Sequence, residues 1–173
     1  MKLYVKKDLL MQKYLNISML ILCVLALSRF IPHPPNFTSL LALSFYVPAI
    51  FGLRYLPVLL ISFAITDFVI GYHTLTFFTW GSVFVIGLIA QLFKKTLLWR
   101  ISGALSGALI FFVVTNFGVW ATGMYGLDLA GIKTTYLLAI PFFAYSILST
   151  LIFSLIIEVI CILCIPHKLK ISN

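Results

Sequence analysis

The sequence predicts an all-α membrane protein, a six-helix transmembrane bundle that forms one domain over residues 1–173. Hydrophobic residues make up 62% of the chain and the mean hydropathy is +1.15, values that no water-soluble core of this size could hide. Only 9% of the residues are charged, and they separate long uncharged stretches comparable with the roughly 20 residues that span a bilayer as a helix. The basic residues, moreover, follow an alternating pattern along the chain.

Six spans are expected, at residues approximately 15–31, 37–53, 55–71, 75–93, 101–123 and 134–160. The first span also resembles a secretory signal, because four lysines precede it and Ala26-Leu27-Ser28 offers small residues for cleavage. However, the segment before the apolar run is long and the bulky Arg29, Phe30 and Ile31 follow it. An uncleaved first helix is therefore favoured.

Proline and glycine punctuate the later elements. Three prolines in residues 32–35 force an extended connection between the first and second spans. On the fifth span, Ser102-Gly103 and Ser106-Gly107 place small residues four apart and predict a close helix contact. Gly81 and Gly87 on the fourth span could make a contact of the same kind. Pro141 lies in the first turns of the sixth span and is expected to kink it.

The net charge of +8 invites a nucleic-acid interpretation, but the positions of the charges argue against it. In the six-span topology most basic residues fall on the inner side (Lys2, Lys6, Lys7, Lys13, Arg54, Lys94, Lys95, Arg100, Lys168 and Lys170), and only Arg29 and Lys133 fall on the outer side. The positive-inside rule then places both termini in the cytoplasm. We expect a multi-pass protein of the bacterial cytoplasmic (inner) membrane, with the lipid bilayer and no nucleic acid as its partner.

The sequence predicts neither an enzyme nor a cofactor or metal site. It contains no HExxH motif, no phosphate-cradling Gly-rich loop and no paired carboxylates, so no catalytic residues are expected. Cys161, Cys164 and His167 are spaced i, i+3, i+6, which suggests metal ligands. Apolar residues separate them and no second ligand pair exists, so apolar packing at a helix end is favoured.

Polar side chains gather in the outer half of the predicted bundle. Asp67 lies one to two turns inside the bilayer, where an ionisable group is costly unless it is paired or hydrated. Arg29 and His33 are the nearest candidate partners. One interpretation is a structural ion pair that locks the first helix to the third. The other is a cavity open to the outside, with substrate-binding residues Arg29, His33, Asn36, Asp67, Tyr72, His73, Trp80, Asn116 and Trp120.

Two further expectations concern aromatic and acidic side chains. Trp80 and Trp120 each lie about a turn or more from a helix end, where they would stack on a flat ligand, although core packing accounts for them equally well. Glu158 should reach the cytoplasmic interface and pair with Arg54 or Arg100.

The chain resembles a known family over nearly its whole length. RFIPHPPNFT at residues 29–38, Thr66-Asp67 followed by Gly71, TNFGVW at 115–120 and AIPFF at 139–143 look like an uncharacterised family of small bacterial integral membrane proteins. That family is in turn similar to the substrate-binding S components of energy-coupling-factor (ECF) vitamin transporters. The shared features are size, six helices, cytoplasmic termini, and an acidic residue plus Gly closing the third helix.

The S-component resemblance implies an outer pocket roofed by the connections after the first, third and fifth helices. It also implies partners: a small-molecule substrate, a membrane coupling subunit and ATP-binding subunits. S components that share a coupling module tend to carry an Ala-x-x-x-Ala face on the first helix, whereas this helix has Ser18, Cys23 and Ala26 without that spacing. A solitary protein or a dedicated partner is the alternative.

Two function classes follow. The first is a substrate-binding protein for uptake of a small vitamin- or cofactor-like molecule, in which Arg29, His33 and Asn36 hold polar or anionic groups while Asp67 and Asn116 exchange hydrogen bonds with the substrate. The second is a non-transport structural or assembly subunit with no ligand. Changing Asp67 to Asn separates them, because a structural lock predicts lost stability, whereas a pocket predicts a folded protein that no longer binds.

Overall fold

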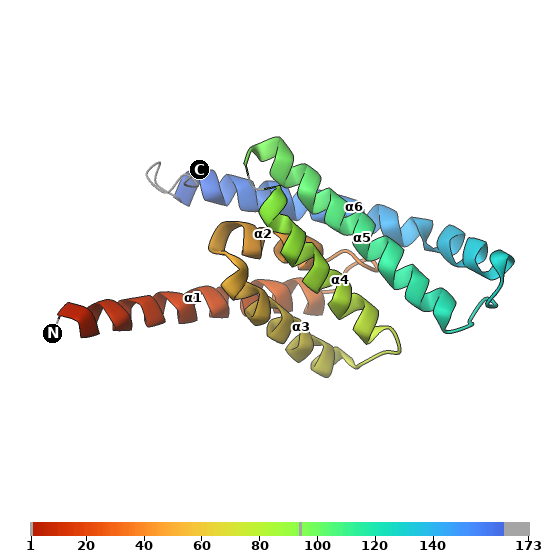
Figure 1. Cartoon of the computed structure of the whole chain (residues 1–173), viewed down its shortest axis with the longest axis horizontal. Helices are drawn as coiled ribbons and strands as arrows, with labels where there is room; N and C mark the ends of the chain where they lie inside the picture. Colours follow the sequence, from red (N-terminus) through yellow and green to blue (C-terminus); the bar gives the residue numbers. More distant parts are fainter. Residues whose placement is uncertain (1, 94, 165–173) are drawn as a thin grey trace.

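The computed structural model describes residues 2–93 and 95–164, and all their regular elements are helical. Six α-helices follow one another (Figure 1): α1 (Lys2–Phe30), α2 (Leu40–Phe51), α3 (Leu56–Ile70), α4 (Thr76–Ile89), α5 (Leu97–Ala121) and α6 (Leu129–Cys164). Two short 3-10 helices, η1 (Leu53–Tyr55) and η2 (Ala90–Leu92), follow α2 and α4. The predicted all-α class with six helices is therefore confirmed for the described residues.

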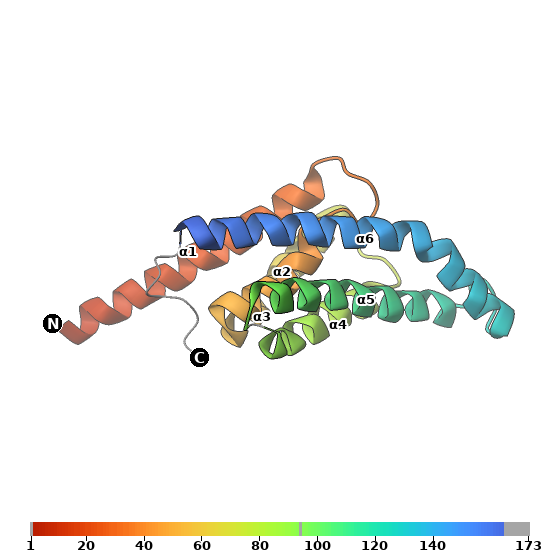
Figure 2. The same cartoon turned by 90° about the horizontal axis from the view of Figure 1, so that it is seen from above.

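The helix bounds differ from the expected spans at several places. α1 begins at Lys2 instead of near residue 15, because the lysine-rich segment holds no Gly or Pro that would stop a helix. α2 ends before Gly52, whose φ of 91° is a conformation that favours glycine. α6 extends beyond the expected 134–160 at both ends. It bends in the part that contains Pro141 (Figure 2), as expected of a proline inside a helix.

Four stretches are long and apolar enough to cross a membrane: Asp8–Phe30, Leu53–Ile70, Leu97–Ala121 and Leu129–Leu163. The apolar helices Leu40–Phe51 and Thr76–Leu92 are shorter. At 1.5 Å per residue the 12 residues of α2 cover roughly 18 Å, less than a hydrocarbon core of about 30 Å. α2 ends before Gly52, and the following η1 belongs to the next long stretch, so α2 by itself is shorter than such a core.

α2 is the central helix of the bundle. Its residues from Leu40 to Ala49 are all buried, and it packs against α3, α4, α5 and α6. α1 packs mainly against α3, and α6 mainly against α5. The connections at residues 31–39, 71–75 and 122–128 lie at one end of the bundle, which we call the loop end; the start of α1 and the last turns of α6 lie at the opposite end (Figures 1 and 2).

Glycines on α5 lie at close helix contacts, as the sequence predicts. A Cβ added to Gly103 would overlap the Phe45 ring and stand 2.6 Å from Cβ of Phe93, and one on Gly107 would stand 2.9 Å from Ile86. These glycines therefore allow α5 to approach α2 and α4 closely.

We expect Gly103→Ala to lower the free energy of unfolding by about 1–3 kcal/mol, the usual cost of overpacking a well-packed core, because Phe45 is fully buried. Gly81→Ala is the matched control. A Cβ at Gly81 meets nothing within 4 Å, so Gly81 does not make the contact considered for it, and alanine there should be neutral or slightly stabilising. Thermal unfolding in one detergent compares the two variants. Equal melting temperatures would contradict the close contact at Gly103.

Candidate functional site

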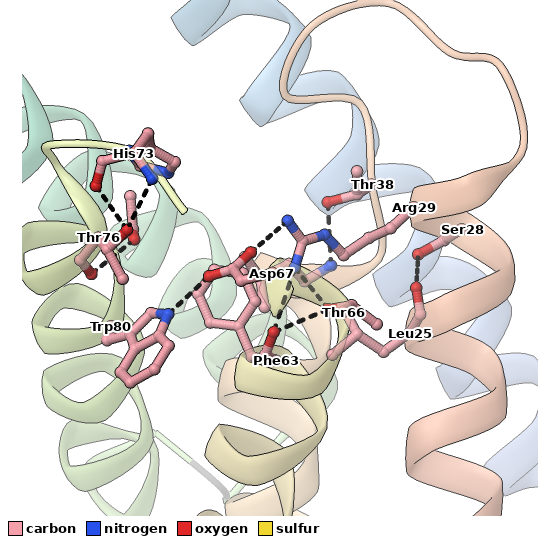
Figure 3. Close-up of polar contacts among 12 residues, drawn as sticks. Leu25, Ser28, Arg29, Thr38, Phe63, Thr66, Asp67, His73, Thr76 and Trp80 are labelled. Carbon is pink, nitrogen blue, oxygen red and sulfur yellow. Dashed lines mark hydrogen bonds and ion pairs between the residues drawn. The ribbon is translucent and has the colours of Figure 1, made fainter. Parts of the chain in front are cut away.

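The predicted ion pair between Arg29 and Asp67 is present (Figure 3). Arg29 lies in the last turn of α1, and its Nη2 is 2.6 Å from Oδ1 of Asp67 in the last turn of α3. The Asp67 side chain is 2% exposed and that of Arg29 is 14% exposed. His33, the other candidate partner, is exposed, and its Nδ1 lies 2.7 Å from the carbonyl of the adjacent Pro34. Arg29 is therefore the group that neutralises Asp67.

Other groups on α3 and α4 complete this site. Nη1 of Arg29 donates to Oγ1 of Thr66 at 2.5 Å and to the carbonyl of Phe63 at 3.5 Å, and its guanidinium lies 4.6 Å from the centre of the Phe63 ring. Nε1 of Trp80 donates to the second carboxylate oxygen, Oδ2 of Asp67, at 2.6 Å (Figure 3). We call Arg29, Phe63, Thr66, Asp67 and Trp80 the Arg29 cluster. It ties together α1, α3 and α4.

The Arg29 cluster is electrostatically self-contained. A buried carboxylate is stable only when its charge is neutralised and its oxygens accept hydrogen bonds. Both conditions hold for Asp67, because Arg29 and Trp80 each donate to one of its oxygens. The sequence suggested Trp80 as a flat surface for a ligand, whereas its indole N–H is engaged as a donor to Asp67. A Trp within reach of a buried acid is the sequence signal for such a donor, because a buried indole N–H usually finds a hydrogen-bond partner.

Three of the predicted site residues, Tyr72, His73 and Asn36, lie in the connections between helices. The exposed Tyr72 packs its ring edge-on against Trp80, with centroids 6.2 Å apart. His73 is exposed and makes local contacts at the start of α4, where its carbonyl accepts from the Thr76 hydroxyl at 2.6 Å. Asn36 has a φ of 62°, uncommon for a residue other than glycine, and its carbonyl accepts from the Ser149 hydroxyl at 3.3 Å. Tyr72 thus stands at the rim of the cluster.

The two predicted residues on α5 are separate from the cluster. The amide of Asn116 donates to the carbonyl of Phe112 at 2.7 Å, one turn earlier in the same helix. The Trp120 ring packs against Phe117 with centroids 5.5 Å apart, and its buried Nε1 has no hydrogen-bond partner among the described residues. Sequence position alone does not reveal that Asn116 bonds to its own helix.

Two surface grooves are found near these residues. One, of about 410 Å³, lies between α3 and α4 and is lined by Leu60, Ile61, Ala64, Phe77, Trp80, Gly81 and Phe84. The other, of about 510 Å³, lies between α5 and α6 and is lined by Phe112, Lys133, Tyr136, Leu137 and Ile140. Trp80 is the one predicted site residue in these linings, so it joins the first groove, which we call the α3–α4 groove, to the Arg29 cluster.

A second ion pair joins α5 to α6. Of the two partners considered for Glu158, Arg100 is the one found: its Nε and Nη2 each lie 2.6 Å from one carboxylate oxygen. Arg54 instead lies over the Tyr55 ring, 5.2 Å from its centre. The bidentate geometry is the strongest form of an arginine–carboxylate contact.

The sequence interpretation missed the buried hydroxyls around this second pair. Tyr46 on α2 and Thr150 and Ser154 on α6 are at most 1% exposed, and α2 packs against α6. The available signal was the spacing of Thr150, Ser154 and Glu158, which puts them on one face of a helix. For the cysteine–histidine run, no group of three metal-ligating side chains occurs within the described residues. The Cys164 side chain and His167 lie outside that part of the chain.

These features define a class: a protein whose described part is all helical, with several helices long and apolar enough to span a membrane and with two ion pairs inside the helix contacts of that part. The chain belongs to the family of unknown function DUF6580, whose model matches residues 10–169. The residues of both ion pairs lie within the matched range, and the match agrees with the prediction of an uncharacterised family. No curated protein and no solved structure matches the chain.

Proposed function

We propose that this chain is a six-span protein of the bacterial cytoplasmic membrane that binds a small molecule at its loop end for uptake. The distribution of basic residues supports the topology. Arg54 lies in η1 and Lys95 in the α4–α5 connection, at the end where α1 begins, whereas Arg29 and Lys133 lie toward the loop end. The positive-inside rule then makes the loop end the outer one and leaves both termini in the cytoplasm.

The observation that carries the binding proposal is the link between a charged cluster and an apolar groove. Trp80 lines the α3–α4 groove, and its indole nitrogen donates to Asp67. Arg29, bound to the same carboxylate, keeps 14% of its side chain exposed. A molecule with an apolar or flat part and an anionic or polar group would meet complementary surfaces within this one site. Vitamin- and cofactor-like molecules have this chemistry.

The resemblance to ECF S components inferred from the sequence extends the proposal to partners. On that similarity the chain would deliver its substrate through a membrane coupling subunit driven by ATP-binding subunits. The surface of α1 has room for such a contact, because Leu15, Met19 and Leu20 are each about half exposed or more and are open to lipid or to a partner helix. Co-purification with ATP-binding subunits from the native membrane tests this part. A protein recovered without them would favour the solitary form.

One observation favours the alternative of a structural or assembly subunit. Both oxygens of Asp67 already have donors, and Arg29 already contacts Asp67, Thr66 and Phe63. The Arg29 cluster is therefore complete without a ligand and would serve as a lock between α1, α3 and α4.

Mass spectrometry of small molecules extracted from the protein in mild detergent separates the two functions. We expect wild-type protein to carry a stoichiometric compound and Asp67→Asn to lose it while remaining folded, because Asn keeps the shape of Asp and an oxygen that accepts from Trp80. Asn116→Ala is measured in parallel, because Asn116 is also a predicted binding residue but bonds to its own helix; if this variant keeps the compound, the site is confined to the Arg29 cluster and its groove. If neither wild type nor variant holds a compound, and Asp67→Asn melts well below wild type, the structural alternative is correct.

A further inference from the structure

The buried face of α6 is polar over its second half. Ser146, Thr150, Ser154 and Glu158 follow one another at four-residue spacing, which places them on one side of the helix, and each is at most 3% exposed. α6 packs against α5 and α2. We call these four residues the α6 row.

The hydroxyl groups near the α6 row differ in their hydrogen bonds. Ser146 donates to the carbonyl of Phe142, one turn earlier, at 3.0 Å, as serine commonly does inside a helix. Within the described residues, neither the Thr150 nor the Ser154 hydroxyl makes a contact with hydrogen-bond geometry. The Tyr46 hydroxyl of α2 lies beside Glu158 and Ser154, yet it also forms no contact with hydrogen-bond geometry.

The row lies between two polar points of the fold. At one end, Glu158 is held by Arg100, but each carboxylate oxygen accepts more than one hydrogen bond and so retains capacity. At the other end, Ser149 is adjacent to Thr150 and donates to the carbonyl of Asn36 in the loop end. The unpartnered hydroxyls therefore lie between the loop end and the second ion pair.

We propose that ordered water molecules bind between α2 and α6 and join Tyr46, Thr150 and Ser154 into one hydrogen-bonded network that ends on Glu158. Side chains four apart on a helix have Cβ atoms about 5–6 Å apart, roughly two hydrogen-bond lengths, so the spacing of successive hydroxyls matches a bridge of one water molecule. Internal water is how proteins usually satisfy such buried groups. Because the charges of Arg100 and Glu158 cancel, the site favours a small neutral molecule that both donates and accepts.

Radiolytic labelling of the wild-type protein in detergent tests the site directly, because hydroxyl radicals formed from bound water oxidise the side chains beside it. We expect Tyr46 to be labelled several-fold faster than Phe45 after correction for the reactivity of the free amino acids. Phe45 is the matched control, since it is the preceding residue of α2 and is fully buried in an apolar cluster. Equal labelling of the two residues would overturn the proposal.

Variants of similar shape supply a second test, because the sign of the change in melting temperature depends on whether water satisfies the hydroxyls. If water satisfies the hydroxyls, Tyr46→Phe, Thr150→Val and Ser154→Ala should each lower the melting temperature by about 2–4 °C, and the Tyr46–Ser154 double variant should lose less than the sum. Ser146→Ala, which removes a hydroxyl already bonded to its own helix, should change it less. Melting temperatures that rise in all three variants would overturn the proposal. The labelling needs no variant, so it decides the question if one fails to fold.

Discussion

Replacing Arg29 by Met is expected to lower the free energy of unfolding by about 3–5 kcal/mol, the cost of removing one partner from a buried ion pair. The cost is high because Asp67 is 2% exposed and would remain charged without a neutralising group. Thr66 and Trp80 would still surround it, but a hydroxyl and an indole supply hydrogen bonds and no charge. Denaturant and thermal unfolding in a mild detergent, followed by circular dichroism, measure the effect.

The double variant Arg29→Met, Asp67→Leu controls for lost packing. Apolar groups of similar volume often replace a buried ion pair at little cost, so the double variant should recover most of the stability that the single variant loses. A loss below about 1 kcal/mol in Arg29→Met, the range of solvent-exposed pairs, would instead show that Asp67 is hydrated. That result would contradict the structural lock, whereas the large expected loss is compatible with substrate binding, because a stabilising ion pair and a binding site can coexist.

Replacing Arg100 by Met is the second change with a large expected effect, again about 3–5 kcal/mol. Glu158 is 3% exposed and would lose the bidentate contact that holds α5 to α6. Removing the acid should cost less, because Arg100 lies in the first turn of α5 with 18% of its side chain exposed and its long side chain can reach solvent. We therefore expect Glu158→Gln to melt above Arg100→Met.

Arg54→Met is the matched control for this pair. Arg54 is exposed and lies over the ring of Tyr55, an arrangement worth about 0.5–1 kcal/mol at exposed sites. Unfolding of the Arg54 and Arg100 variants under the same conditions gives the comparison. Similar losses in both variants would mean that the contact with Glu158 contributes no more than a surface interaction.

Elements and charge pairs were predictable from the sequence because both depend on position along the chain. Uncharged stretches identify the helices, and the depth of a charged residue in its helix restricts its partners. On that basis Arg29 was correctly considered for Asp67, and Arg100 for Glu158. The binding roles of the nine residues named from the sequence stay predictions, since geometry alone does not test them.

The lateral arrangement of the helices was not predictable, for a physical reason. In a soluble protein the buried face of a helix is the apolar one, whereas lipid is as apolar as a protein core. Phe77 on α4 is 85% exposed, while Ser149, Thr150 and Ser154 on α6 are fully buried. Hydropathy therefore gives no indication that α2 is central or which helices contact α6. The hydrogen bond from Trp80 to Asp67 depends on that same lateral packing.

The order of the two ion pairs along the chain has a consequence for biosynthesis. In both pairs the arginine is synthesised first, and Glu158 follows Arg100 by 58 residues. Each arginine lies in the terminal turn of its helix, where its long side chain reaches the polar edge of a bilayer before the acid exists. Each carboxylate then enters with its counter-charge already in place. In the proposed membrane topology, α3 and α6 thus enter the membrane after α1 and α5, the helices that carry their arginine partners. Neither Asp67 nor Glu158 then lies in lipid without a counter-charge.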